Sequence, residues 1–347
     1  MKYAYKTEIK PNEKQAFKIK QSIGICRWLY NKYISMNKRL YTMYQRALLD
    51  DRQAYFVSAN DFDKYINNKI KTKPNFTWIN NCGSKARKKT LINAEIAMKG
   101  FLSGKTAFPK YKYKYNEEIK LYFPKNNKTD WVIERHRIKI PTLKYVCLKE
   151  YGYLPTDAQV INGVVSYVAR KYYVSITIER DFPKIRANID NIGLRFSFKD
   201  FETISQEMLN VIKAKKIKTK LAYSHHILAR KNAQNHRRNI DYLTKNAQKE
   251  LVKIKQLEAQ LNYLKEDYLN KCVYQILQLK PQTITLRYFS FKSFRDNDFV
   301  GDNEVIKDKY YNFTKRLFAK AQRYNIKIKH TTNFKDFTDP ILEVELI

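Results

Sequence analysis

The sequence has no run of about 18 apolar residues, and its opening, MKYAYKTEIK, lacks the apolar stretch of a secretory signal. We therefore expect neither a membrane span nor export, and interpret the chain as a cytoplasmic protein without a membrane partner.

Cysteine is scarce: the chain has four, and no C-x-x-C pair occurs among them. Isolated cysteines argue against a disulfide framework and against a zinc site. We expect ordinary buried or free thiols at Cys26, Cys82, Cys147 and Cys272.

Acidic residues are few, with 33 Asp and Glu against 68 Lys and Arg, and the formal net charge is +35 over 347 residues. This excess far exceeds what solubility requires and indicates a polyanionic partner. Hydrophobic residues make up 44% of the chain and aromatic residues 14%, which is enough to bury a real core. The charge therefore belongs to a folded protein and not to a disordered basic tail.

Hydrophobic periodicity divides the chain into regions. Residues 12–104 show helical spacing, with Asn12 as a plausible helix start after Pro11. Residues 106–180 alternate apolar and polar side chains between prolines, which predicts an antiparallel sheet or a small barrel.

A third region begins with a predicted strand at 192–198. No Gly or Pro occurs between Leu194 and Lys280, so long helices are expected there. Strands at 283–289 and 326–329, with a helix at 303–324 between them, predict a final α/β region. The helical part carries an amphipathic stripe of coiled-coil type formed by Leu251, Ile254, Leu257, Leu261, Leu264 and Tyr268.

Positive charge is concentrated in three segments. The first, 84–89 (SKARKK), opens a predicted helix, where its lysines could meet phosphates or bases; a solvated helix end is the alternative. The second, 108–115 (FPKYKYKY), alternates Lys with Tyr and would place cations on one face and rings on the other. That pattern suits a backbone-tracking, base-stacking surface, and an edge strand guarded by lysines is the alternative.

The third segment, 213–249, holds eleven Lys and Arg, three His and a single acidic residue, Asp241. A solvated helix usually mixes both signs, so this composition favours phosphate contact. The histidines, His225, His226 and His236, have no carboxylate or cysteine at metal-ligand spacing and are interpreted as polar surface groups.

The order of these parts resembles the TnpB family of transposon-encoded RNA-guided nucleases, which are related to the type V CRISPR effectors. Residues 5–33, with Arg-Trp-Leu-Tyr-Asn at 27–31, are similar to the family's N-terminus. Residues 91–112 are similar to a family helix that ends in paired aromatics, a glycine and Pro-x-aromatic-Lys. Lys139-Ile140-Pro141 and residues 172–176 match barrel strands. The resemblance covers nearly the whole chain.

The chain departs from the family pattern at the cutting site. Arg195 stands where the family's first RuvC strand has its catalytic Asp, and Arg287 stands where a later strand has a catalytic Glu. The zinc ribbon and the third motif have no counterpart after Lys329. RuvC-type cleavage holds two divalent ions between carboxylates, and an arginine puts a permanent positive charge there instead. The resemblance thus implies a chain that is not an enzyme, with no catalytic residue, no zinc and no catalytic magnesium site.

The resemblance also implies a multidomain α+β fold. A WED-like β-barrel would comprise residues 1–10 and 105–188, and a helical REC-like domain, residues 11–104, would be inserted in it. Residues 189–347 would form a degenerate, C-terminally truncated RuvC domain of RNase H-like α/β fold. That domain would carry a long helical insert at about 205–280 and no zinc ribbon.

Among these proteins the chain resembles the nuclease-dead TnpB-like repressors (TldR), which occupy a guide-specified target beside a short duplex motif and block transcription. The expected partners are a guide RNA and double-stranded DNA, in a monomeric bacterial ribonucleoprotein associated with the nucleoid. One alternative is an active endonuclease with an atypical site, either because the register that places the two arginines is shifted or because Asp200, Asp298, Asp336 or Asp339 rescues the site. Another is an RNA-binding relic of a transposon protein. A generic RNA-binding or ribosomal protein would explain the charge but not the order of the parts.

The residues expected to contact nucleic acid are basic or polar side chains, among which Lys85, Lys88, Lys89, Asn126 and Asn127 occupy family positions that approach the duplex motif. They are Ser84, Lys85, Lys88, Lys89, Lys110, Lys112, Lys114, Lys125, Asn126, Asn127, Lys213, Lys215, Lys216, Lys218, Lys220, Arg230, Arg237 and Arg238.

Overall fold

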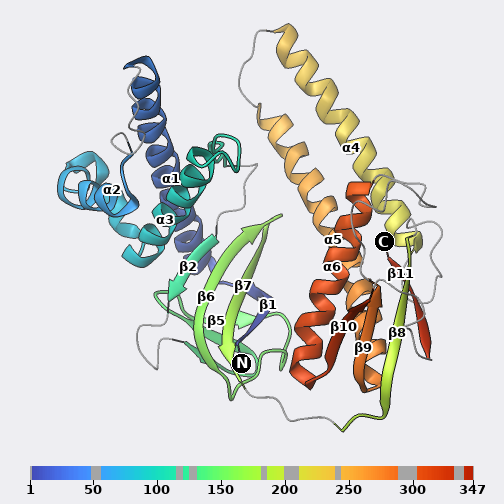
Figure 1. Cartoon of the computed structure of the whole chain (residues 1–347). Coiled ribbons are helices and arrows are strands. Elements are labelled where there is room, and N and C mark those ends of the chain that lie inside the picture. The colour runs from blue at the N-terminus through green and yellow to red at the C-terminus, as the bar shows by residue number, and fades with distance from the viewer. Residues whose placement is uncertain are drawn as a thin grey trace. The chain divides into compact units, whose positions relative to one another are not determined.

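The computed structural model divides into two compact units, residues 1–180 and 181–347, each of mixed helix and strand (Figure 1). None of the described helices combines the length and hydrophobicity of a transmembrane span. The structure describes residues 2–47, 56–114, 120–124, 131–180, 186–198, 211–238, 244–287, 303–331 and 340–346.

Unit 1 contains a seven-stranded antiparallel sheet of order β2-β6-β7-β1-β5-β4-β3. The predicted antiparallel pairing is confirmed, and in the described part of the chain no ladder joins β2 to β3. The first strand of the chain lies in its interior, between β7 and β5. The strands are β1 (Lys2–Lys10), β2 (Lys120–Pro124), β3 (Val132–Ile133), β4 (Arg137–Ile140), β5 (Lys144–Leu148), β6 (Gln159–Val168) and β7 (Lys171–Glu179).

Local chemistry explains the longest hairpin, β6–β7. Its two-residue turn, Ala169-Arg170, has φ of 49° and 66°, the left-handed values that a type I′ turn requires at both positions. Gly163 in β6 lies against the indole ring of Trp131, where any Cβ would overlap the ring. The glycine therefore lets Trp131, which is buried, pack directly on the strand.

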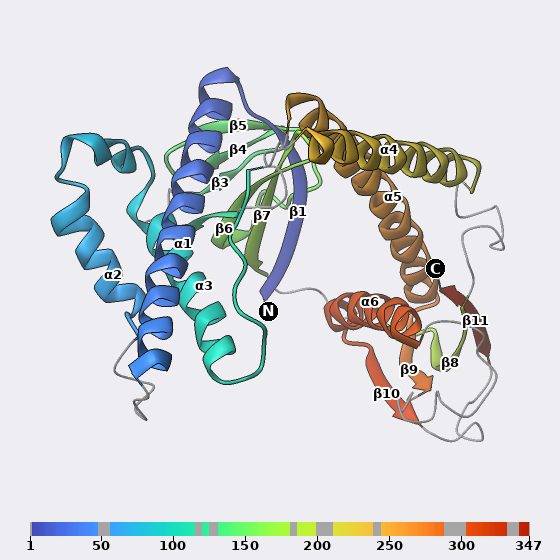
Figure 2. The same cartoon turned by 90° about the horizontal axis from the view of Figure 1, so that it is seen from above.

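The helices of unit 1 follow one another in the sequence between strands β1 and β2. The predicted start of the first helix is confirmed: the backbone N–H of Gln15 donates to Asn12 Oδ1 at 2.9 Å, and that of Asn12 to Gln15 Oε1 at 3.0 Å, a reciprocal capping box. Figure 2 shows the first and third helices side by side. The helices are α1 (Glu13–Ala47), α2 (Ala59–Tyr65), η1 (Ile66–Ile70), η2 (Pro74–Asn81) and α3 (Ser84–Leu102).

Unit 2 is built on four parallel strands in the order β10-β9-β8-β11. The predicted strand at 192–198 and the predicted helix at 303–324 are confirmed, whereas the last strand was not predicted. Its elements are β8 (Ile189–Phe198), α4 (Val211–Arg237), α5 (Lys245–Gln278), β9 (Pro281–Arg287), α6 (Asn303–Ala321), η4 (Gln322–Tyr324), β10 (Lys327–Thr331) and β11 (Ile341–Leu346).

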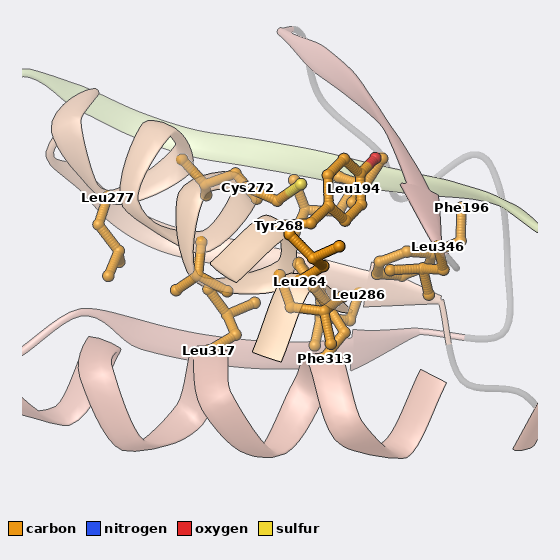
Figure 3. Close-up of a cluster of buried hydrophobic side chains, with 14 of the residues drawn as sticks. Leu194, Phe196, Leu264, Tyr268, Cys272, Leu277, Leu286, Phe313, Leu317 and Leu346 are labelled. Carbon is orange, nitrogen blue, oxygen red and sulfur yellow. The ribbon is translucent and has the colours of Figure 1, made fainter. Parts of the chain in front are cut away.

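The core of unit 2 joins these strands to α5 and α6 (Figure 3). Leu194 and Leu286 come from neighbouring strands, Tyr268 from α5, and Phe313 and Leu317 from α6; each is 1% exposed or less. The predicted stripe on α5 supplies part of this core, since Leu257, Leu264 and Tyr268 belong to it. The apolar residues that recur at steps of three and four thus form the face of α5 that packs on the sheet.

Candidate nucleic-acid interface

The first turn of α3 presents part of the predicted contact set. Ser84, Lys85 and Lys88 are exposed, and no acidic residue occurs in this turn. Gly83 is the N-cap and provides no side-chain cap. Lys89 is half-buried, with its Nζ 5.9 Å from the ring centroid of Tyr122 in β2. A helix N-terminus carries partial positive charge, and the lysines add to it, so this end of α3 attracts anions.

The next residue of the same motif behaves differently. Arg87 is only 5% exposed, and its Nε and Nη1 have no hydrogen-bond partner among the described residues. A buried cation without full compensation is costly. The burial of Arg87 was not predictable, because nothing in the basic run itself shows which of its residues faces the core.

In its described part, up to Lys114, the Lys-Tyr segment of residues 108–115 does not form the predicted row of lysines on one face and row of tyrosine rings on the other. Residues 107–113 are irregular, and Lys112 is half-buried while Tyr113 is 62% exposed. The reason is a side chain on α1: Asn31 Nδ2 donates to the backbone carbonyl of Lys112 at 2.9 Å, and Asn31 Oδ1 accepts from its N–H at 2.8 Å. Lys112 Nζ also lies 4.6 Å from the ring centroid of Tyr30. Only Lys110 and Lys114 are exposed cations here.

Helix α4 presents a strongly basic surface. Lys213, Lys215, Lys216 and Lys220 are exposed and Lys218 is half-buried. The buried residues Val211, Ala214 and Ile217 recur at steps of three, which leaves the lysines on the remaining surface of the helix. Further along the chain the predicted contacts Arg230, Arg237 and Arg238 are exposed as well.

Tertiary packing adds lysines that the sequence analysis missed. Lys265 of α5 is half-buried, and burial together with the charges of Lys309 on α6 and Lys218 on α4 lowers its pKa. Three cations from three helices therefore raise the positive potential at one place. These residues lie far apart in the sequence, and only the packing of the helices shows that they belong together.

Arg195 lies where the alternation of β8 predicted it. Leu194 and Phe196 are buried and Arg195 is exposed, so the arginine is on the opposite face of the strand. Its register partner is Glu343 on β11, which is also exposed. Arg287 is the last residue of β9 and pairs through its backbone position with Thr331 of β10.

Strand β11 brings carboxylates that the sequence analysis did not consider. Glu343 and Glu345 are in register with Arg195 and Ser197, and register partners in a sheet project to the same face. Within the residues that the structure describes, no three His, Cys, Asp or Glu side chains are grouped so that they could hold a metal ion. Alternation of Leu342, Val344 and Leu346 with the two glutamates was the available signal for this strand.

Several predicted residues lie outside the described ranges. They are the contact candidates Lys125, Asn126 and Asn127, and the possible rescuing carboxylates Asp200, Asp298, Asp336 and Asp339.

Comparison with known proteins gives a match to a family model at the N-terminus and a longer match to one protein at 22% identity. Residues 1–46 match the model HTH_OrfB_IS605, described as a helix-turn-helix domain. In this structure those residues form β1 and the continuous helix α1. A protein of Escherichia coli (strain K12) named "Putative RNA-guided DNA endonuclease InsQ" is 22% identical over 271 residues, which cover 77% of this chain. The match spans 61% of that relative's length.

Two solved structures are distantly similar. One is titled as the cryo-EM structure of a Cas12f1-sgRNA-target DNA complex; it has 14% identity and a TM-score of 0.44, over 91% of this chain and 72% of that one. The other is titled as a CRISPR-Cas12f ternary complex, with 13% identity and a TM-score of 0.32 over 92% and 72% of the two chains.

These comparisons correct one prediction. We expected a chain that is not an enzyme, but the relative identified by sequence carries the name of an endonuclease. The comparison points to a nuclease family, so the prediction of a non-enzyme is wrong as stated. Two arginines at aligned strand positions were too little to decide the activity, since β11 adds carboxylates to the same face of the sheet.

Proposed function

We propose that this chain is an RNA-guided DNA-binding protein of the TnpB family. The observation that carries the proposal is the basic face of α4, whose exposed lysines Lys213, Lys215, Lys216 and Lys220 lie on a folded unit with its own core. A polyanion is the partner that such a face fits. Similarity over 271 residues to a protein named as an RNA-guided DNA endonuclease supports RNA and DNA as the polyanions.

The domain assignment is part of the proposal. Residues 1–10 and 105–188 are assigned to a WED-like domain, which is supported by the pairing of β1 with β5 and β7. Residues 11–104 are assigned to a REC-like insertion between its strands. Residues 189–347 are assigned to a RuvC-like domain, supported by the parallel strands β8 and β9 on either side of the α4–α5 insert.

In this proposal a guide RNA held by the basic surfaces pairs with one strand of the target, and the protein recognises a short duplex motif beside it. The N-terminal end of α3, with Ser84, Lys85 and Lys88, is assigned to the duplex. Occupancy of a target at a promoter would repress transcription, and repression is the cellular output that we propose.

A second candidate function is RNA-guided cleavage, favoured by the name of the relative identified by sequence. Glu343 and Glu345 lie on the strand beside Arg195, so carboxylates are present at that edge of the sheet. Binding and cutting share the guide and the target, and they differ in whether the phosphodiester bond is broken.

The test is to purify the chain with its bound RNA, sequence that RNA, and incubate the complex with DNA matched to its variable end. One abundant RNA species with a constant scaffold is expected, together with DNA binding that disappears after the RNA is removed. Heterogeneous RNA, or equal binding by RNA-free protein, would contradict the proposal. Parallel reactions with magnesium or manganese, analysed for nicks, separate occupancy from cleavage.

A further inference from the structure

Two cysteines that are far apart in the sequence meet inside unit 1. Cys26 lies on α1 and Cys82 in the link between η2 and α3, 56 positions later, and their Sγ atoms are 3.7 Å apart. Both are buried, with 0% and 2% exposure. A disulfide needs a sulfur separation of about 2.05 Å, so the two sulfurs have to approach by only about 1.7 Å.

The surroundings favour a thiolate on one of the two sulfurs. The hydrogen bond between the two thiols lowers the pKa of Cys82; burial opposes this effect, and the Ser22 hydroxyl and the Arg87 charge add to it. The pKa of Cys26 is raised, because it shares its proton with Cys82 and is buried. Deprotonation is favoured at Cys82, and the Cys26 sulfur, 3.7 Å away, is within reach as the resolving thiol.

The buried arginine gains an explanation from the same geometry. Arg87 Nε and Nη1 lack hydrogen-bond partners among the described residues, and its positive charge favours the thiolate form of both cysteines, although the pKa of Cys26 stays raised. A thiolate at Cys82 would supply the negative charge that this buried guanidinium otherwise lacks. The sequence offered no sign of the pair, because isolated cysteines indicate free thiols.

We propose that Cys26 and Cys82 are a reversible oxidation site that forms an intramolecular disulfide between α1 and the start of α3. With a hydroperoxide as oxidant, the Cys82 thiolate attacks the peroxide oxygen, breaks the O–O bond and becomes a sulfenic acid. The Cys26 thiol then attacks that sulfur, and the S–S bond forms as water leaves. Two thiols and one hydrogen peroxide give one disulfide and two waters; a thiol reductant reverses the change.

The disulfide would close a long loop of the chain, between Cys26 and Cys82. Cross-linking positions 56 residues apart removes much conformational freedom from the unfolded chain, which stabilises the folded state. The melting temperature of unit 1 should rise on oxidation by on the order of 10 °C. A merely adjacent pair of thiols would give no such rise.

The experiment treats the purified full chain with hydrogen peroxide, then labels free thiols under denaturing conditions and maps the labelled peptides. We expect the reduced chain to be labelled at every cysteine and the oxidised chain only at Cys147 and Cys272, with Cys26 and Cys82 recovered as one cross-linked peptide. The Cys272→Ser variant is the matched control, since it removes a different buried thiol and should keep the cross-link and the rise in melting temperature. The Cys82→Ser variant should lose both.

Three results would overturn the inference. They are labelling of Cys26 and Cys82 after peroxide treatment, recovery of Cys82 as a sulfinic acid with Cys26 still free, and cross-links that run mainly through the exposed Cys147. Because the peptide map is made on the wild-type chain, the outcome does not depend on whether a serine variant folds.

Discussion

Removing charge from α4 should reduce the salt dependence of nucleic-acid binding. The change is Lys213→Gln, Lys215→Gln, Lys216→Gln and Lys220→Gln in one chain, with the half-buried Lys218 retained. All four side chains are exposed, so the free energy of unfolding should change by no more than about 0.5 kcal/mol for each. A loss of binding can then be assigned to the interface and not to the fold.

The size of the effect follows from counterion release. Each phosphate that a lysine neutralises contributes about −0.9 to the slope of log K against log salt on duplex DNA and about −0.7 on a single strand. Four contacts therefore make the wild-type slope steeper than that of the variant by up to about 3.6 on a duplex and about 2.8 on a single strand. Doubling the salt should lower the affinity of the wild type about 12-fold more than that of the variant on a duplex.

The assay is fluorescence anisotropy with labelled RNA or DNA from low to moderate salt. The matched control replaces four other exposed lysines with Gln: Lys64, Lys99, Lys149 and Lys171. The Nζ of each lies 2.8 to 3.9 Å from a carboxylate oxygen of Asp61, Glu95 or Glu8. Each has an acidic neighbour that competes with phosphate for its charge, so their removal should change the slope less than removal of the α4 lysines does. Equal slopes for the α4 variant and the wild type would refute the role assigned to α4.

Three further predictions concern unit 1. Lys85→Gln with Lys88→Gln should weaken binding of target DNA while RNA retention is unchanged, as measured by filter binding; equal losses of both would contradict the assignment of α3 to the duplex. Gly163→Ala should destabilise the chain by about 1–3 kcal/mol in urea titrations, because the new Cβ overlaps the Trp131 ring. Glu8→Gln should lower the melting temperature at pH 7. Burial raises the pKa of Glu8, but hydrogen bonds from Lys149 and Lys171 outweigh it and leave the pKa below 4.5, so the difference from wild type should shrink as the pH falls below that value.

Local patterns predicted the elements that depend on local chemistry. Asn12 and Gln15 form the expected cap, and Leu257, Leu264 and Tyr268 on α5 enter the core as their spacing indicated. The alternation around Arg195 was also confirmed, because a strand with one buried face must alternate.

The features that were wrongly predicted or missed depend on contacts between segments that are distant in the sequence. The Lys-Tyr segment does not alternate as expected, because Asn31 on another element binds the backbone of Lys112. Lys218, Lys265 and Lys309 come together through the packing of three helices, and Cys26 meets Cys82 through tertiary contacts. Neither contact can be predicted from a short stretch of sequence. Strand β11 has an alternating pattern in its sequence, with Leu342, Val344 and Leu346 between two glutamates, and was predictable from it.

RNA guidance is tested most directly by exchanging the guide. The chain is loaded with either of two RNAs that share one scaffold and differ in the variable end, and each complex is presented with both matched DNA targets. If the RNA supplies the specificity, binding follows the guide: each complex retains its own target and releases the other, while the protein surface stays the same. The same DNA preference with both RNAs, or with none, would contradict the account, since specificity would then reside in the protein alone.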